Sequence, residues 1–126
     1  MALSKDFEAF AIELFSHLGP VRVKRMFGGA LAYAGDLGFA LLDDDAIWIK
    51  VDEISEPAFE AEGLPRFTYP MKDGRVMEMA YRRLPEIAMD DAAEAARWGR
   101  MGIEAAARKA VAKPRKAKAA SRAKAS

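Results

Sequence analysis

Three short apolar runs follow one another in the middle of the chain, and they constrain the fold more than any other feature. The runs are GALAYA (29–34), LGFALL (37–42) and AIWIKV (46–51). They are separated by Gly35-Asp36 and by the aspartates at 43–45. Apolar runs of this length between turn residues are typical of β-strands joined by tight connections. This part of the chain therefore predicts an antiparallel meander of three strands.

Helical spacing is evident before the meander. Apolar residues recur every three or four positions between residues 4 and 18, with Ser4 as a plausible N-cap. Gly19-Pro20 should end this helix. A second, short helix is expected over 55–63, with Ser55 as N-cap and Gly63 as its C-terminal stop.

Two further strands and a long helix complete the chain. RFTYP (66–70) and RVMEMAYRR (75–83) read as strands joined by a tight turn at Asp73-Gly74. An Ala-rich helix should begin near Asp90, since acids open it and cations close it. Its expected buried face contains Ala95, Trp98, Met101, Gly102 and Ala105.

The order α-β-β-β-α-β-β-α contains no βαβ crossover that would require a parallel sheet. The sequence therefore predicts an α+β fold, with one antiparallel sheet of about five strands and the helices on one of its faces. The length of 126 residues permits one domain, expected over residues 1–110. The strand aromatics are Tyr33, Phe39, Trp48, Tyr69 and Tyr81. Aromatic sheet faces can bind single-stranded nucleic acid, but only where the rings point away from the helices and have basic neighbours. Most of these residues should instead fill the core or a dimer interface.

Composition excludes several kinds of site. The chain has no Cys, so disulfides, thiolate metal sites and Cys nucleophiles are absent. Acids at the N-terminus argue against a secretory signal, and no apolar run is long enough to span a membrane. A cytoplasmic protein that does not bind membranes is expected.

Charge is divided unevenly along the chain. Residues 1–107 hold twelve Lys or Arg and all nineteen Asp and Glu, a balance of −7, whereas the remainder holds eight cations and no acid. Residues 111–126 lack large apolar side chains and should form a flexible basic tail. Its cations could bind nucleic acid weakly and without sequence specificity, or the tail could serve only to keep the protein soluble. The candidates are Arg108, Lys109, Lys113, Arg115, Lys116, Lys118, Arg122 and Lys124.

Residues 23–53, VKRMFGGALAYAGDLGFALLDDDAIWIKVDE, resemble the signature of the TfoX/Sxy N-terminal domain family. A second block at 59–85, FEAEGLPRFTYPMKDGRVMEMAYRRLP, continues the same pattern, so the resemblance spans about 20–107. The family signature at its start is Arg25, Met26, Phe27, Gly28 and Gly29.

The resemblance implies a small α+β domain similar to the type III secretion chaperone fold and often dimeric. Its best-known members regulate natural competence, and they are proposed to act with a cAMP-responsive transcription activator. Such members usually carry a second, helical C-terminal domain, in whose place this chain has the basic tail. The resemblance implies a transcription-factor partner, and it carries over no catalytic residue.

Other motifs favour structure over chemistry. Gly28 and Gly29 could form a phosphate-binding nest, but no helix with Lys-Ser/Thr follows. They are therefore expected to bend the chain while Met26 and Phe27 fill the core. Arg25 is left open as a partner contact. The three consecutive aspartates suit a solvated turn better than a cation site, and the single His17 has no fellow ligand for zinc. No cofactor, metal or catalytic residue is therefore expected.

Trp48 alternates with Ile47 and Ile49, so both sides of its strand carry large side chains. A second subunit is the simplest cover for such a sheet, which makes Trp48 the dimer-interface candidate. Two functions remain open. The first is a non-catalytic, transcription-associated regulator that binds a protein partner, with nucleic-acid affinity from the tail. The second is a dimeric protein-interaction or chaperone-like module without a nucleic-acid role.

Overall fold

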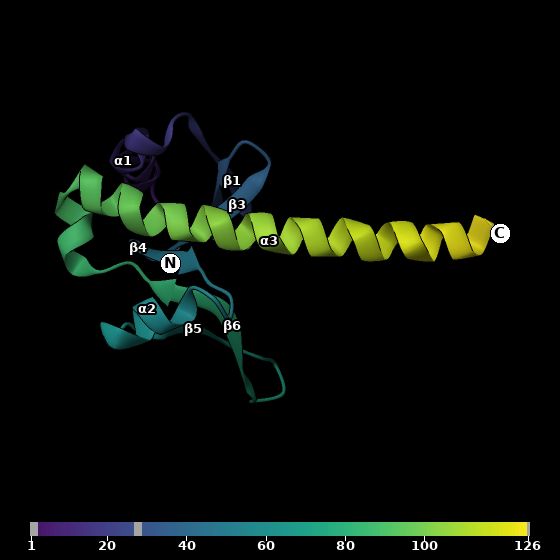
Figure 1. Ribbon diagram of the computed structural model, residues 1–126. Coiled ribbons are helices and arrows are strands. Elements are labelled where there is room, and N and C mark those ends of the chain that lie inside the picture. Colours follow the sequence, from purple (N-terminus) through teal and green to yellow (C-terminus); the bar gives the residue numbers. More distant parts are fainter. Residues whose placement is uncertain (1–2, 27–28, 126) are drawn as a thin grey trace.

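The computed structural model describes residues 3–26 and 29–125, with side chains described through Val111. Figure 1 shows three helices around one sheet, with the last helix running across the sheet and projecting beyond it. The α-helices are α1 (Lys5–Leu14), α2 (Glu56–Ala61) and α3 (Ala92–Ala125), and short 3-10 turns lie at η1 (Ser16–Leu18) and η2 (Glu86–Asp90).

Six strands form one antiparallel sheet in the order β1-β2-β3-β4-β6-β5. They are β1 (Val21–Met26), β2 (Gly29–Ala34), β3 (Leu37–Asp43), β4 (Ala46–Lys50), β5 (Arg66–Pro70) and β6 (Val76–Arg83). The α+β class and the antiparallel sheet predicted from sequence are confirmed.

The number of strands was underestimated by one, because β1 is absent from the sequence prediction. In VRVKRM, Val21 and Val23 alternate with Arg22 and Lys24, so only one side of the segment is half-buried. Such an edge strand lacks the continuous apolar run by which β2, β3 and β4 are recognised. Its structure depends on pairing with β2, where Val23 lies opposite Ala32.

The tight turns predicted from sequence are confirmed by backbone angles. Gly35 and Gly74 have φ values of 62° and 90°, in the region that favours glycine. Asp44 and Asp45 also have positive φ, at 49° and 60°, and they join β3 to β4. Aspartate tolerates this conformation better than most residues, which accounts for the run of aspartates at the turn.

All three helices pack against one face of the sheet. α3 packs on β3 and β4, and α1 packs on β1 and α3. Phe59 of α2 meets Trp98 of α3 edge-on, with ring centroids 4.8 Å apart. The core between helices and sheet also encloses Phe15, Phe39, Leu42, Ile47, Ile49 and Leu84. One face of the sheet thus packs against the helices and forms the core, and the opposite face is not covered by these helices.

The buried face of α3 agrees with the sequence prediction. Ala95, Trp98, Gly102 and Ala105 are buried, and Met101 is partly buried against the core. The Asp91 carboxylate accepts hydrogen bonds from the backbone N–H groups of Ala93 and Glu94, at 2.9 and 3.2 Å. Asp91 therefore caps the helix.

The backbone of α3 continues as a helix through Ala125. The side chains of residues 112–126, which form most of the expected basic tail, lie outside the described part of the chain. The flexibility of this tail, and a domain boundary near residue 110, therefore stay predictions.

Candidate binding face of the sheet

The face of the sheet opposite the helices combines aromatic, apolar and cationic side chains. Successive strand residues point to opposite faces, and the pairing register shows which residues share a face. Ile47 and Ile49 lie in the core, so Trp48 between them lies on the helix-free face. We call this surface the open face; its strand residues include Arg22, Lys24, Leu31, Tyr33, Leu41, Trp48, Lys50, Phe67, Tyr69, Tyr81 and Arg83.

One row of side chains crosses five strands of the open face. Lys24 lies opposite Leu31, which lies opposite Leu41. Trp48 is paired with Leu41 on one side and with Arg83 on the other. Lys24 and Arg83, the two ends of this row, are exposed, and the three residues between them are half-buried. The row thus has an apolar centre with a cation at each end.

Phe67 of β5 extends the apolar centre of this row. Its ring meets Trp48 edge-on, with centroids 5.1 Å apart, and the Arg83 guanidinium lies 5.5 Å from the centroid of the Trp48 ring. Both distances are within the range of favourable aromatic and cation–π contacts.

A second pair of cations lies on tyrosines of the open face. The Arg22 guanidinium is 4.7 Å from the centroid of the Tyr33 ring, and Lys50 Nζ is 5.1 Å from that of Tyr81. Tyr33 lies over Gly38 of β3, where an added Cβ would meet its ring at 3.3 Å. Tyr81 is only 8% exposed, and this burial raises the pKa of its hydroxyl, with a smaller contribution from Tyr33. The Tyr81 hydroxyl therefore stays neutral, and its largely covered ring supports the side chains of this part of the face.

The strand aromatics, expected to fill the core or a dimer interface, are divided between the two faces of the sheet. Of the five strand aromatics named from sequence, Phe39 lies in the core, whereas Tyr33, Trp48, Tyr69 and Tyr81 lie on the open face. The sheet pairing places them there, because Tyr33 lies opposite Arg22, Tyr81 lies opposite Lys50 and Tyr69 lies opposite Met77, all on the side away from the helices. Trp48, the dimer-interface candidate, lies at the centre of this face, and its role in a dimer stays a proposal.

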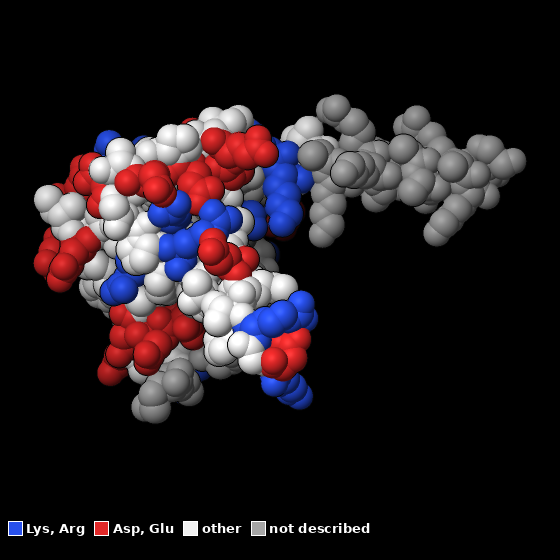
Figure 2. Space-filling model, turned by 90° about the horizontal axis from the view of Figure 1, so that it is seen from below, with Lys and Arg blue, Asp and Glu red and all other residues white. Residues whose placement is uncertain are grey.

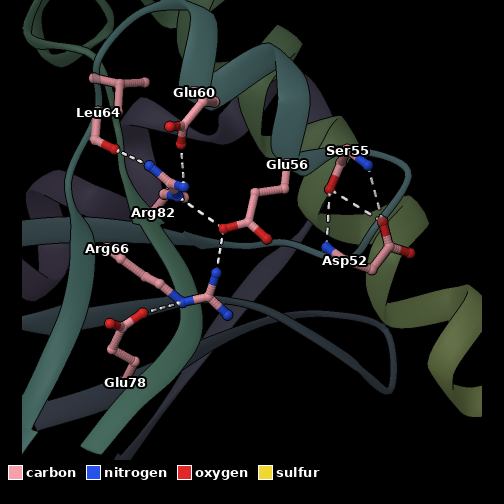
Figure 3. Close-up of polar contacts among 8 residues, drawn as sticks. All are labelled: Asp52, Ser55, Glu56, Glu60, Leu64, Arg66, Glu78 and Arg82. Atoms are coloured by element: carbon pink, nitrogen blue, oxygen red, sulfur yellow. Dashed lines mark hydrogen bonds and ion pairs between the residues drawn. The ribbon is translucent and has the colours of Figure 1, made fainter.

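On the other face, an ion-pair network attaches α2 to strands β5 and β6 (Figure 3). The Glu56 carboxylate accepts hydrogen bonds from Arg82, at 3.0 Å from Nε, and from Arg66. Arg82 also donates to Glu60 and to the Leu64 carbonyl. Burial alone would raise the pKa of Glu56, but the hydrogen bonds from both arginines outweigh burial and lower it. The network fixes α2 against β5 and β6. The cations of the open face are not part of it.

A second ion pair attaches the later part of α3 to the connection between β4 and α2. Arg108 donates to both carboxylate oxygens of Asp52, from Nε at 2.6 Å and from Nη2 at 2.9 Å. Ser55 also donates to Asp52 from its backbone N–H, at 3.0 Å. The hydrogen bonds from Arg108 hold the pKa of the Asp52 carboxyl well below its usual range.

The described family-signature residues lie at the end of β1 and the start of β2. Arg25 is used within the fold, because its Nε lies 2.9 Å from Glu8 Oε2 and its Nη1 donates to the Leu3 carbonyl. Met26 is half-buried at the end of β1. An added Cβ on Gly29 would lie 2.6 Å from the Leu42 carbonyl oxygen, so this position requires glycine. Phe27 and Gly28 lie outside the described residues.

The cations proposed for nucleic acid are only partly described. Arg108 is engaged by Asp52, and Lys109 is exposed. The side chains of Lys113, Arg115, Lys116, Lys118, Arg122 and Lys124 lie outside the described part, so their role stays a prediction.

Sequence reasoning missed Arg22, Lys24, Phe67 and Arg83 as members of a binding face. The alternation of cations with valines in β1 is a signal that could have placed the first two on one side of a strand. The pairing of β4 with β6 brings Arg83 next to Trp48. No comparable local pattern in the sequence predicts this pairing.

On the side shown in Figure 2, acidic side chains cover large areas of the body, and cations form smaller patches between them. Within the residues that the structure describes, no helix has the length and apolar character needed to cross a membrane.

Comparison with known proteins identifies the family. The family model for the TfoX N-terminal domain matches residues 13–106, which include all six strands and most of the residues that pack on them. No curated protein matches the chain. The chain belongs to the TfoX N-terminal domain family.

Proposed function

We propose that this protein is a non-catalytic, transcription-associated regulator that acts in the cytoplasm by binding a transcription factor. Regulation of the competence type is what membership of the TfoX N-terminal domain family suggests. The C-terminal cations add weak, nonspecific affinity for nucleic acid, which would hold the complex near DNA.

The observation that carries this proposal is the separation of charge along the chain. An acidic body of balance −7 is followed by a segment with eight cations and no acid. Because Arg108 is held by Asp52, the charge available to phosphates comes chiefly from the six cations between Lys113 and Lys124. Charge of one sign on a terminal extension is typical of segments that bind nucleic acid through its backbone.

The β5–β6 hairpin offers a surface for the protein partner. The hairpin projects from the body in Figure 1, and it carries Tyr69, Val76 and Met77 with half or more of each side chain exposed. Large apolar side chains gathered at one projecting site favour contact with another protein.

The nucleic-acid part is tested by duplex binding over a salt series with full-length chains. In one variant Lys113, Arg115, Lys116, Lys118, Arg122 and Lys124 are replaced by Gln; the control variant carries Arg97→Gln and Arg100→Gln on α3. Each lost phosphate contact reduces the log–log salt slope by about 0.9, so the tail variant should bind more weakly with a slope smaller by up to about 5. Equal binding by the tail variant and the wild-type chain would remove this part of the proposal.

A second candidate function is a dimeric protein-interaction module without a nucleic-acid role. It is favoured by the apolar centre of the open face, where Leu31, Leu41 and Trp48 lie in one row. Sedimentation equilibrium at tens of micromolar tests it. A dimer requires twice the chain mass of 13.8 kDa, and a mass that stays at the single-chain value would exclude it.

A further inference from the structure

The open face concentrates positive charge on a body that is otherwise acidic. Arg22, Lys24, Lys50 and Arg83 lie on its strands, and Asp43 is the one acid at a described strand position of this face. Three other cations of the body, Arg25, Arg66 and Arg82, are used in ion pairs on the helix side of the sheet. The charge of the open face is therefore complementary to an anionic partner.

Three of the four cations of the open face are accessible to such a partner. Lys24 and Arg83 are exposed and form no ion pair among the described residues. Arg22 has 61% of its side chain exposed, and its nearest acid, Asp36, is 3.9 Å away and fully exposed. An exposed ion pair at this distance is weak and readily exchanged for a phosphate contact.

Aromatic rings lie between these cations. Trp48 and Phe67 are half-buried at the centre of the face, and Tyr69 is 51% exposed toward the hairpin. Interleaved aromatic and cationic side chains on a sheet are the arrangement that binds single strands, because unpaired bases stack on the rings while phosphates meet the cations.

Two other occupants fit this face less well. A second copy of the chain, docked face to face, would bring the same cations against one another, and that repulsion opposes association. A DNA duplex keeps its bases stacked inside, so it could use the cations but not the rings of Trp48 and Phe67.

We propose that the open face binds single-stranded nucleic acid, with bases stacked on Trp48 and Phe67 and phosphates held by Lys24, Arg22 and Arg83. This site lies on the folded domain and is independent of the C-terminal cations invoked for duplex binding. It goes beyond the proposed function by adding a second ligand class and a defined surface.

The test uses full-length chain with oligo(dT) and oligo(U) of about 12 nucleotides, a length within the range that one sheet platform covers. Binding is measured by anisotropy of the labelled strand over a salt series, with a duplex of the same length as comparator. At least one single strand should bind more tightly than the duplex. Binding of neither strand would overturn the proposal, and so would tighter binding of the duplex than of both strands by the variant with the six tail cations replaced.

Two variants of the face separate charge from stacking. Lys24→Gln with Arg83→Gln should lower the magnitude of the single-strand salt slope by about 1.4, since each contact contributes about 0.7. Phe67→Leu keeps an apolar side chain but removes the ring, and it should weaken binding about tenfold or more. Arg97→Gln with Arg100→Gln, which changes the charge equally on α3, should bind as the wild type does. Wild-type binding by both face variants, each with a normal thermal transition, would refute the site.

Two further readouts distinguish this site from the C-terminal cations and from a dimer. The variant with six tail cations replaced should keep its single-strand binding even if duplex binding is lost; loss of both would assign the affinity to the tail and overturn the inference. Bound bases should quench tryptophan fluorescence in the wild type but not in Trp48→Phe, where Trp98 is the remaining tryptophan. Absence of that difference, or self-association that excludes the strand, would also count against it.

Discussion

Gly102 shows how a single missing side chain sets the distance between α3 and the sheet. An added Cβ there would lie 2.6 Å from the Phe39 carbonyl oxygen and 2.8 Å from Ile49 Cγ2. The first of these atoms belongs to the backbone of a central strand and cannot move away cheaply. The close approach of helix and sheet therefore depends on glycine, even though glycine lowers helix propensity by about 1 kcal/mol relative to alanine.

We expect Gly102→Ala to lower the free energy of unfolding by about 1–3 kcal/mol, because overpacking outweighs the gain in helix propensity. Urea denaturation followed by circular dichroism measures the change. Ala93→Ser, at an exposed position of the same helix, is the control and should stay within about 0.5 kcal/mol of wild type. A more stable Gly102→Ala variant would show that the helix can move away from the sheet at little cost.

At the scale of elements, the ion pair between Asp52 and Arg108 joins the β4–α2 connection to the later part of α3. Side chains of both residues are about one-third exposed, so solvent weakens the pair without removing it. Because the pKa of Asp52 is lower in the folded chain than in the unfolded one, ionised Asp52 stabilises the fold above the unfolded pKa of about 3.9. That stabilisation is lost as the pH falls below this value.

We therefore expect Asp52→Asn to be less stable than wild type at pH 7, with a difference that shrinks as the pH falls below about 4. Urea titrations at several pH values measure both curves. Asp36→Asn is the matched control, since its fully exposed carboxylate lies 3.9 Å from Arg22 and should contribute little at any pH. A constant difference between Asp52→Asn and wild type down to pH 3 would mean that the neutral hydrogen bonds, and not the charge, hold the connection.

The elements also differ in how clearly their sequences predict them. α3 was predicted with its buried face, since Ala95, Trp98 and Gly102 recur at helical spacing. β1 was not predicted, because the residues of this edge strand are at most half-buried and its apolar pattern is weak. Its cations are half of the positive charge on the strands of the open face, so the missed strand also hid the candidate site.

At the scale of the whole molecule, the fold separates acidic and basic side chains that are interspersed along the sequence. Glu56 and Glu60 gather with Arg66 and Arg82 around α2, where they neutralise one another. Lys24 and Arg83, far apart in the chain, lie on the same face, the one without helices, at the two ends of one row of side chains. The acidic body formed by residues 1–107 thereby acquires a basic surface with aromatic side chains, apart from the C-terminal cations.

The sequence by itself determined the antiparallel meander, the turns at Gly35, Asp44 and Gly74, the buried stripe of α3 and the family. These features depend on local periodicity and on backbone preferences of single residues, which a linear pattern records. Only the tertiary structure decided which side of each strand meets the helices and which residues share the open face. The pairing of β4 with β6 places Trp48 beside Arg83. Such a register is set by contacts between segments far apart in the chain, and neither segment's own sequence indicates its partner.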